Sequence, residues 1–343
     1  MEVVEVKGEK SLSRILVGES IDNLRNYTLG KRIFIVTDKN VERLYKHRFP
    51  NVPTYAIEPG EGSKNLLTTI DIYRWLLESN VDRSSLIVGI GGGVVCDLTG
   101  FVASTYMRGV DFGFVSTTLL SQVDASVGGK NGVDLDGYKN IIGTFNQPKF
   151  VICDISMLKT LHPFEFISGM AEVVKHALIA DKDKFDFIKI NKDAILNLNI
   201  EMLEYLVVKS VKIKARIVEA DEREQGVRRV LNLGHTWGHA VEKYTGMSHG
   251  YAVSIGLVFS ANFSVIKGLM KPEERDNLVD LLTGIGLPLS YNKNEHEVFE
   301  ILKKDKKKEN DFIHFVLMNG IGNAQVEKIG LKEIEKFIQN GTL

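Results

Sequence analysis

Apolar residues in the first part of the chain come in short, nearly continuous runs rich in valine and isoleucine. These runs occupy residues 32–37, 53–57, 86–90, 112–116 and 150–153. Between two of them, in residues 65–78, apolar positions recur at the spacing of an α-helix. Strands that are apolar throughout and alternate with helices are typical of a parallel sheet covered on both faces. The pattern therefore predicts an α/β domain.

After residue 163 the pattern changes to helical periodicity. Helices are expected at residues 164–180, 201–219, 229–243, 252–267, 273–283, 298–304 and 331–339. We place the boundary at residues 155–162, where Pro148 and Pro163 bracket a short connection. The predicted organisation is an α/β domain with a mainly parallel, Rossmann-like sheet at 1–155, followed by an all-α domain at 160–343.

Composition narrows the class of protein. The 343 residues suit two domains, and 44% hydrophobic with 25% charged residues is the balance of a soluble globular protein. Lys and Arg number 43 against 44 Asp and Glu, so a net charge of −1 argues against nucleic-acid binding. The most apolar stretch, 252–266, is interrupted by Ser and Asn, which predicts a buried helix and no membrane span.

The expected compartment is the cytoplasm. The N-terminal residues include three glutamates and no apolar stretch, so no signal peptide is expected. Cys96 and Cys153 are the two cysteines, and their number and separation fit a reducing environment.

A glycine-rich segment suggests a nucleotide. Residues 89–97 (GIGGGVVCD) follow the run 86–90 and begin a helix, an arrangement that brings backbone N–H groups close to a phosphate. A tight turn that needs small residues is the alternative. The segment also departs from the Rossmann fingerprint, because residue 94 is Val. Asp38, at the end of the first run, is placed either to bind ribose hydroxyls or to cap the next helix.

Three histidines within fifteen residues suggest a metal. His235 and His239 are four residues apart and share one face of a helix, and His249 follows. With a carboxylate such as Glu172, imidazoles suit Zn²⁺. Spacing alone pairs His235 with His239 as ligands, and surface or core histidines are the alternative.

Several cations stand beside small or apolar neighbours. They are Arg108, Lys130, Lys139, Lys175, Lys214 and Arg228. Together with a glycine loop and a metal, they suggest a small substrate bearing phosphate or carboxylate. The run 303–308 (KKDKKK) is typical of a solvated helix end.

The motifs, in order, resemble those of the 3-dehydroquinate synthase family, which belongs to the sugar-phosphate cyclases. They are PGEGSK at 59–64, GGGVVCD at 91–97, ASTYMRG at 103–109, STTLLSQVDASVGGKNGVD at 116–134, KNIIGTFNQP at 139–148, GMAEVVKHA at 169–177, ADERE at 220–224, LNLGHTWGHA at 231–240, HGYAVSIG at 249–256 and DKKK at 305–308. The resemblance implies an NAD-binding N-terminal domain, a helical metal-binding C-terminal domain, an active site in the cleft between them and a homodimer.

The resemblance also implies roles for individual residues. The ligands of Zn²⁺, with Co²⁺ as an alternative, are then Glu172, His235 and His249, so that His239 becomes a proton-transfer residue and not a ligand. The implied NAD site consists of Asp38, Asn40, Glu61, Lys64, Gly92, Gly93, Val94, Asp97, Thr117, Thr118, Lys139 and Thr160. The implied substrate contacts are Arg108, Asp124, Lys130, Asn140, Lys175, Lys214, Arg228, Asn232, His235, His249 and Lys306. Lys175 and His239 are implied catalytic residues, and Glu224 is an implied second proton acceptor.

The implied reaction starts from 3-deoxy-D-arabino-heptulosonate 7-phosphate. Oxidation of its C5 alcohol by NAD⁺ acidifies the C6 proton, phosphate is eliminated, the ketone is reduced again, and ring opening and an aldol closure give 3-dehydroquinate. NAD is recycled in each turnover, so the protein is expected to be a lyase of the shikimate pathway. The metal, as a Lewis acid, stabilises the developing alkoxide.

Three positions depart from the family pattern. Tyr251 stands where Glu is usual in the HGEAV motif, Cys96 where Gly is common, and Asp311 where a turn Gly is usual. Because His249 is retained, we expect metal binding to be retained.

Three other functions compete with this interpretation. One is another sugar-phosphate cyclase, acting on sedoheptulose 7-phosphate or glucose 6-phosphate, which the retained Lys214, Arg228, Asn232 and Lys306 argue against. Another is a metal-dependent polyol dehydrogenase, for which Lys130 and Asn140 would have no clear purpose. The last is an NAD-binding protein without catalysis, supported only by Tyr251.

Overall fold

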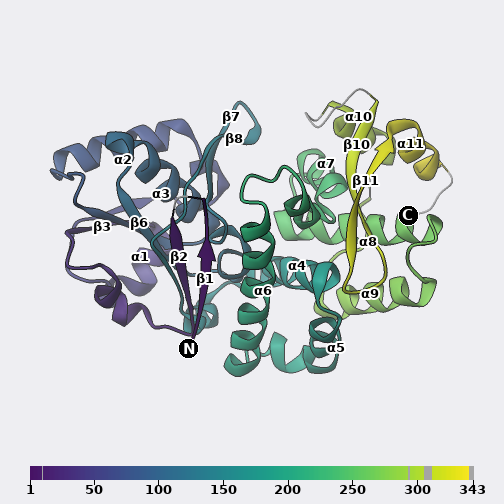
Figure 1. Cartoon of the computed structure of the whole chain (residues 1–343), viewed down its shortest axis with the longest axis horizontal. Helices are drawn as coiled ribbons and strands as arrows, with labels where there is room; N and C mark the ends of the chain where they lie inside the picture. Colours follow the sequence, from purple (N-terminus) through teal and green to yellow (C-terminus); the bar gives the residue numbers. More distant parts are fainter. Residues whose placement is uncertain (10, 293, 305–310, 340–343) are drawn as a thin grey trace. The chain divides into compact units, whose positions relative to one another are not determined.

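The computed structural model describes residues 1–9, 11–292, 294–304 and 311–339. The chain divides into two compact units (Figure 1). The first contains Met1–His162 and Leu203–Arg223, and the second contains Pro163–Met202 and Glu224–Leu343. The sequence pattern did not indicate that Leu203–Arg223 groups with the first unit.

The first unit is built on a seven-stranded sheet. Its strands are β1 (Glu2–Lys7), β2 (Leu12–Val17), β3 (Ile33–Asp38), β4 (Thr54–Ile57), β5 (Leu86–Gly91), β6 (Asp111–Ser116) and β9 (Phe150–Cys153), in the order β1-β2-β9-β6-β5-β3-β4. Only the β1–β2 pair is antiparallel. Each of the five predicted runs forms a strand, and the predicted mainly parallel sheet is confirmed.

The connections between strands reverse direction next to β3. From β3 the chain passes outward to β4, then returns across β3 to β5 and continues to β6 and β9. In open parallel sheets a ligand binds beyond the carboxyl ends of the strands at such a point. Helices α1 (Lys39–Tyr45), α2 (Leu66–Glu78) and α3 (Gly93–Thr105) connect these strands, and α6 (Ile200–Ala220) is the long helix of Leu203–Arg223.

A separate two-stranded hairpin completes the first unit. Strands β7 (Lys130–Leu135) and β8 (Tyr138–Phe145) pair antiparallel through a two-residue turn, Asp136–Gly137, with φ angles of 50° and 76°. Positive φ at both positions is what a type I′ hairpin turn requires. Neither this hairpin nor the β1–β2 pair was predicted.

The second unit is helical, as predicted. Its helices are α4 (Pro163–Ala180), α5 (Lys182–Leu196), α7 (His235–Thr245), α8 (His249–Ile266), α9 (Pro272–Ile285), α10 (Glu295–Lys304) and α11 (Leu331–Gln339). One antiparallel pair, β10 (Phe312–Met318) and β11 (Ala324–Gly330), is an addition to the predicted all-α arrangement. Trp237 and Phe259 stack at 4.2 Å between ring centroids in the core of this unit, which also contains Phe299, Phe315 and Phe337.

Helix α8 lies at the centre of this core. It is long and apolar enough to cross a membrane by length and composition, but 72% of it is buried inside the structure, the pattern of a core helix. Two of its glycines allow close approach to neighbouring helices. A Cβ at Gly250 would lie 1.9 Å from the Ser168 carbonyl oxygen of α4, and one at Gly256 would lie 1.8 Å from the carbonyl oxygen of Gly234.

The helix predicted at residues 229–243 is wrong as a single element. The chain forms a 3₁₀-helix at Val227–Asn232 and then starts α7 at His235. Gly234 lies between them with φ of 77°, a left-handed conformation that glycine adopts without strain. The break matters because it makes His235 the first residue of a new helix.

Candidate metal centre and nucleotide-binding loop

Three helices of the second unit bring a carboxylate and two imidazoles together. Glu172 lies on α4 and is fully buried, while His235 and His249 are the first residues of α7 and α8. Oε1 of Glu172 lies 3.5 Å from Nε2 of His235 and 3.6 Å from Nε2 of His249. One ligand atom from each residue lies within 4.8 Å of the other two.

Neighbouring acceptors orient both imidazoles. Nδ1 of His235 lies 3.1 Å from the carbonyl oxygen of Leu233, and Nδ1 of His249 lies 3.4 Å from Oε2 of Glu242. When Nδ1 donates its proton to such an acceptor, the lone pair of Nε2 is available to a metal. Both Nε2 atoms face the Glu172 carboxylate, as two ligands of one shared metal would.

The size and chemistry of this group fit a divalent cation. With metal–ligand bonds of about 2.0–2.1 Å, two ligand atoms of a tetrahedral zinc site lie about 3.3–3.4 Å apart. The observed 3.5 and 3.6 Å are close to that separation. Two imidazoles and one carboxylate also form a donor set used at catalytic zinc sites, which keep a fourth position open.

The two imidazoles differ in their electrostatic surroundings. Burial, reinforced by the ammonium of Lys175, holds the pKa of His235 well below its ordinary value, so this ring is neutral. Burial opposes the charged form of His249 too, but hydrogen bonds to Glu172 and Glu242 raise its pKa to about 9. Because a ligand must be deprotonated, a cation at this site competes with a proton on His249.

His239 lies beside this group on the same helix as His235. Its ring centroid is 5.1 Å from that of His235 and 5.8 Å from that of His249. It forms a second possible ligand group with Glu242 and His249. Among the described residues, no possible ligand group contains both His235 and His239, the pair that spacing alone suggested.

Glu242 is a residue that the sequence analysis missed. It lies one turn after His239 on α7, so its spacing on the helix was a signal that it shares a face with that histidine.

The other predicted residues of this unit are mostly buried or hydrogen-bonded. Lys175 and Arg228 are each 1% exposed, and Lys175 forms an ion pair with Glu172. Asn232 donates a hydrogen bond to Glu224, whose φ is 57°. Lys306 lies outside the described residues.

In the first unit, the glycine loop lies at the carboxyl end of β5. Gly92 is the N-cap of α3 and provides no side-chain hydrogen bond to it, so the first N–H groups of the helix remain available to an anion. A Cβ at Gly91 would lie 2.5 Å from Cγ2 of Val95, and one at Gly92 would lie 3.0 Å from Cγ2 of Thr118. Both positions therefore favour glycine, as a phosphate-binding loop does.

Asp38 lies at the carboxyl end of β3, the strand next to β5 where the connections reverse. Its Oδ1 accepts hydrogen bonds from the N–H groups of Asn40 and Val41, at 2.9 and 3.0 Å, so it caps α1. Burial raises the pKa of this carboxyl group above its ordinary value. The capping role that the sequence allowed is thus present, at a position that also faces the loop end of the sheet.

Charged residues of the loop region are paired. Nζ of Lys64 lies 2.5 Å from Oδ2 of Asp97, and Nζ of Lys139 lies 3.6 Å from Oε1 of Glu61. Burial alone would lower the pKa of Lys64, but Asp97 and Glu61 outweigh it and raise that pKa, so this side chain stays cationic.

Other predicted residues lie elsewhere in the first unit. Nζ of Lys214 lies 2.6 Å from both Oδ1 and the carbonyl oxygen of Asp124. Arg108 and Asn140 have φ angles of 68° and 51°, which are uncommon for residues with side chains. The remaining predicted residues are Lys130 at the start of β7, Thr117 and Thr118 after β6, Val94 and Gly93 in the first turn of α3, and Thr160, whose hydroxyl lies 2.5 Å from that of Tyr45.

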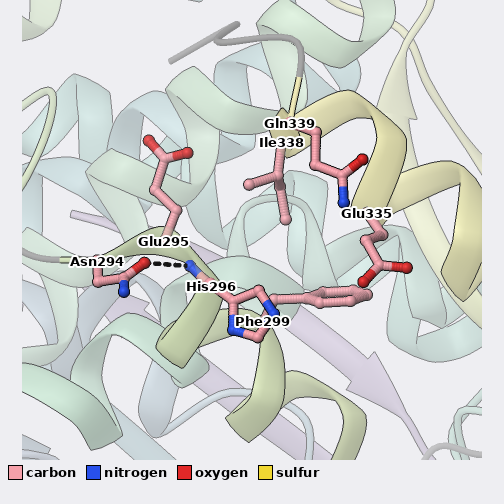
Figure 2. Close-up of a pocket in the computed structure, with 7 residues that line it drawn as sticks. All are labelled: Asn294, Glu295, His296, Phe299, Glu335, Ile338 and Gln339. Carbon is pink, nitrogen blue, oxygen red and sulfur yellow. Dashed lines mark hydrogen bonds between the residues drawn. The ribbon is translucent and has the colours of Figure 1, made fainter.

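A pocket of about 330 Å³ lies between α10 and α11 (Figure 2). It is lined by Asn294, Glu295, His296, Phe299, Glu335, Ile338 and Gln339. None of the predicted site residues lines it, so it is separate from both groups described above.

The fold has known counterparts. 2-epi-5-epi-valiolone synthase from Streptomyces hygroscopicus, solved with NAD⁺ and Zn²⁺ bound, superposes with a TM-score of 0.88 at 23% identity, covering 99% of each chain. The chain thus has the same fold as this synthase.

Comparison of sequences identifies the family, which comparison of folds does not. Residues 54–168 match the model of the 3-dehydroquinate synthase N-terminal region, and residues 169–308 match that of the C-terminal region. A 3-dehydroquinate synthase of Thermoanaerobacter pseudethanolicus is 39% identical, covering 96% of this chain and 98% of the relative. One of Campylobacter concisus is 42% identical, covering 91% and 92%. The chain belongs to the 3-dehydroquinate synthase family.

Proposed function

We propose that the protein is a lyase that converts 3-deoxy-D-arabino-heptulosonate 7-phosphate to 3-dehydroquinate and phosphate, the second step of the shikimate pathway. The observation that carries the proposal is the Glu172–His235–His249 group, of which Glu172 and His235 are buried, in a chain that matches this family over both halves. Zn²⁺, or Co²⁺ in its place, supplies Lewis acidity when bound there, and NAD⁺ supplies reversible hydride transfer.

Glu172, His235 and His249 are the proposed metal ligands. Their support is the pair of 3.5 and 3.6 Å separations and the two Nδ1 contacts, to Leu233 and Glu242, that aim Nε2 of each imidazole. His239 is adjacent but shares no possible ligand group with His235. We assign it the proton-transfer role that the family resemblance implies.

The proposed nucleotide site lies at the loop end of β3, β5 and β6. The N-terminus of α3, behind Gly92, would receive the pyrophosphate, and Asp38 with Asn40 would hold a ribose. The cationic Lys64 is held by Asp97 beside this loop. The other proposed contacts are Glu61, Gly93, Val94, Thr117, Thr118, Lys139 and Thr160.

The proposed substrate residues hold phosphate and carboxylate groups in one pose, so that successive steps share a site. They are Arg108, Asp124, Lys130, Asn140, Lys175, Lys214, Arg228, Asn232 and Lys306, together with the two ligand histidines. Proton transfer is assigned to His239, to Lys175 and to Glu224, which Asn232 orients by a hydrogen bond.

The protein is further proposed to be a cytoplasmic homodimer, without nucleic-acid or membrane partners, in which residues 1–155 bind NAD and residues 160–343 bind metal and substrate. Helix α2 has exposed apolar side chains at Leu67, Ile70 and Leu77, which suit contact with a second copy. Sedimentation of the purified protein tests the dimer, and a monomer at micromolar concentration would contradict it.

The test of the activity is incubation with the heptulosonate phosphate while phosphate release and NADH absorbance are followed together. Phosphate should appear without accumulation of NADH. Stoichiometric NADH would indicate a polyol dehydrogenase, and faster turnover of sedoheptulose 7-phosphate would indicate another cyclase.

A further inference from the structure

The segment between α6 and the 3₁₀-helix Val227–Asn232 is held by a carboxylate that has no place in the proposed chemistry. Oε2 of Glu222 accepts a hydrogen bond from the backbone N–H of Glu9 at 2.6 Å. Its Oε1 accepts one from Nε2 of Gln147 at 2.9 Å. Glu222 thereby joins three parts of the first unit that are far apart in sequence.

Two further contacts reinforce this attachment. Oε1 of Glu219 accepts a hydrogen bond from the N–H of Lys7 at 2.9 Å. Arg223 forms an ion pair with the Glu9 side chain at 3.0 Å, but both side chains are more than half exposed. Exposed pairs contribute little, so the attachment depends mainly on the two hydrogen bonds to Glu222, and the one from Gln147 is partly buried.

The backbone at Gly8 lies close to the Glu222 carboxylate. A Cβ at Gly8 would lie 2.4 Å from Oε1 of Glu222 and 3.2 Å from Cγ of Gln147. Gly8 is not among the glycines with positive φ, so the backbone conformation does not require glycine there. A side chain at residue 8 would instead displace the Glu222 carboxylate from its present position.

Gln147 links Glu222 to a strand that carries a proposed substrate residue. Gln147 is 4% exposed, and a Cβ at Gly129 would lie 2.9 Å from its side-chain amide. Gly129 immediately precedes Lys130, the first residue of β7. Glu222 is therefore connected, through Gln147, to the two ends of the β7–β8 hairpin.

Two residues after Glu222 comes Glu224, in a left-handed backbone conformation with φ of 57°. Such a conformation persists in a residue with a side chain only where the surroundings determine it. We propose that Glu222 is a positioning residue, which fixes the segment 219–223 against Glu9 and Gln147 and so fixes where the chain presents Glu224. The inference rests on the proposed function of Glu224 as a proton acceptor.

The test compares Glu222→Ala and Gly8→Ala with the matched control Glu9→Ala. The control removes the exposed ion pair to Arg223 but keeps the Glu9 N–H that Glu222 accepts. Since small displacements of a catalytic group can cost about 100-fold, kcat should fall by about 10–100-fold in Glu222→Ala and Gly8→Ala with KM nearly unchanged. The control should stay within about two-fold of the parent.

A double variant and hydrogen exchange make the test specific. Gly8→Ala in the Glu222→Ala background should cost little more than either change alone, because the atom that the new Cβ meets is gone. Backbone amides of residues 219–224, measured without substrate, should exchange faster in both variants and not in the control. In an active parent, an unchanged kcat or additive effects would overturn the proposal, and unchanged exchange would overturn it in any case.

Glu224→Gln separates this proposal from the proposed function. If that change leaves the reaction intact while Glu222→Ala impairs it, Glu224 is not the proton acceptor and the positioning role assigned to Glu222 is wrong. If the parent enzyme releases no phosphate at all, the proposed function fails, while faster exchange in Glu222→Ala would still show the attachment.

Discussion

Tyr251 stacks on Phe164, with ring centroids 4.5 Å apart and an angle of 27° between the planes. Tyr251 lies in the first turn of α8 and Phe164 in the first turn of α4. The residue that replaces the family's usual Glu thus contacts an aromatic ring, which is a packing role.

We therefore expect Tyr251→Glu to leave zinc content and turnover within a few-fold of the parent. Loss of an aromatic pair costs about 0.5–1.5 kcal/mol, a change in stability that leaves the folded site intact. Zinc affinity is measured by competition with a chromogenic chelator, and circular dichroism confirms the fold. A change of ten-fold or more in zinc affinity, with the fold unchanged, would contradict this expectation.

His249→Ala and His239→Ala should distinguish the residue that binds zinc from the residue that transfers protons. The first removes Nε2 that faces Glu172, so bound zinc and activity should be lost together. The second should keep zinc and lose activity. Zinc is counted by atomic emission after gel filtration, and equal loss in both variants would show that His239 belongs to the ligand set.

Removing the charge of Glu242 should weaken the metal site without removing a ligand. Glu242→Gln leaves the three proposed ligands in place but loses the carboxylate at Nδ1 of His249. Partners of this kind commonly alter metal affinity or activity by about 10–100-fold, and we expect a weaker zinc affinity in that range. Asp280→Asn, an exposed acid on α9, is the control of equal charge and should have no effect.

Gly92→Ala should weaken NAD binding. Its Cβ would lie 3.0 Å from Cγ2 of Thr118 and stand at the N-terminus of α3, where a pyrophosphate must approach. We expect the dissociation constant of NAD⁺ to rise about ten-fold or more, equivalent to about 1.4 kcal/mol. Gly330→Ala, whose Cβ would meet only Cε1 of Phe312 at 3.8 Å, is the control. Equal NAD⁺ affinities in calorimetry for the two variants would contradict the assignment.

The strands of the first unit were predictable because they are buried on both faces, which leaves continuous apolar runs. The β7–β8 hairpin was not, because most residues of β8 are exposed and no apolar run marks it. Helix α5 was missed for a related reason: it mixes lysines and aspartates with few buried residues. The break at Gly234 had a signal, the glycine itself, but helical periodicity on both sides of it favoured one helix.

The site was partly predictable. The spacing of His235 and His239 indicated a metal site in this segment, but ligand sets depend on where each Nε2 points. That direction is set by the carbonyl oxygen of Leu233 and by Glu242, neither of which a spacing argument contains. The role of Glu222 has no signal at all, because its partners Glu9 and Gln147 are far away in sequence.

The possible ligands Glu172, His235 and His249 come from three different helices, two of them at their first residue. An ion held by them would cross-link α4, α7 and α8, and unfolding of this unit would have to release it. The melting temperature of the second unit would then depend on the concentration of free metal, because a ligand that binds only the folded state stabilises that state by mass action. The cell's supply of zinc would in this way set how long the folded protein persists, as well as whether it is active.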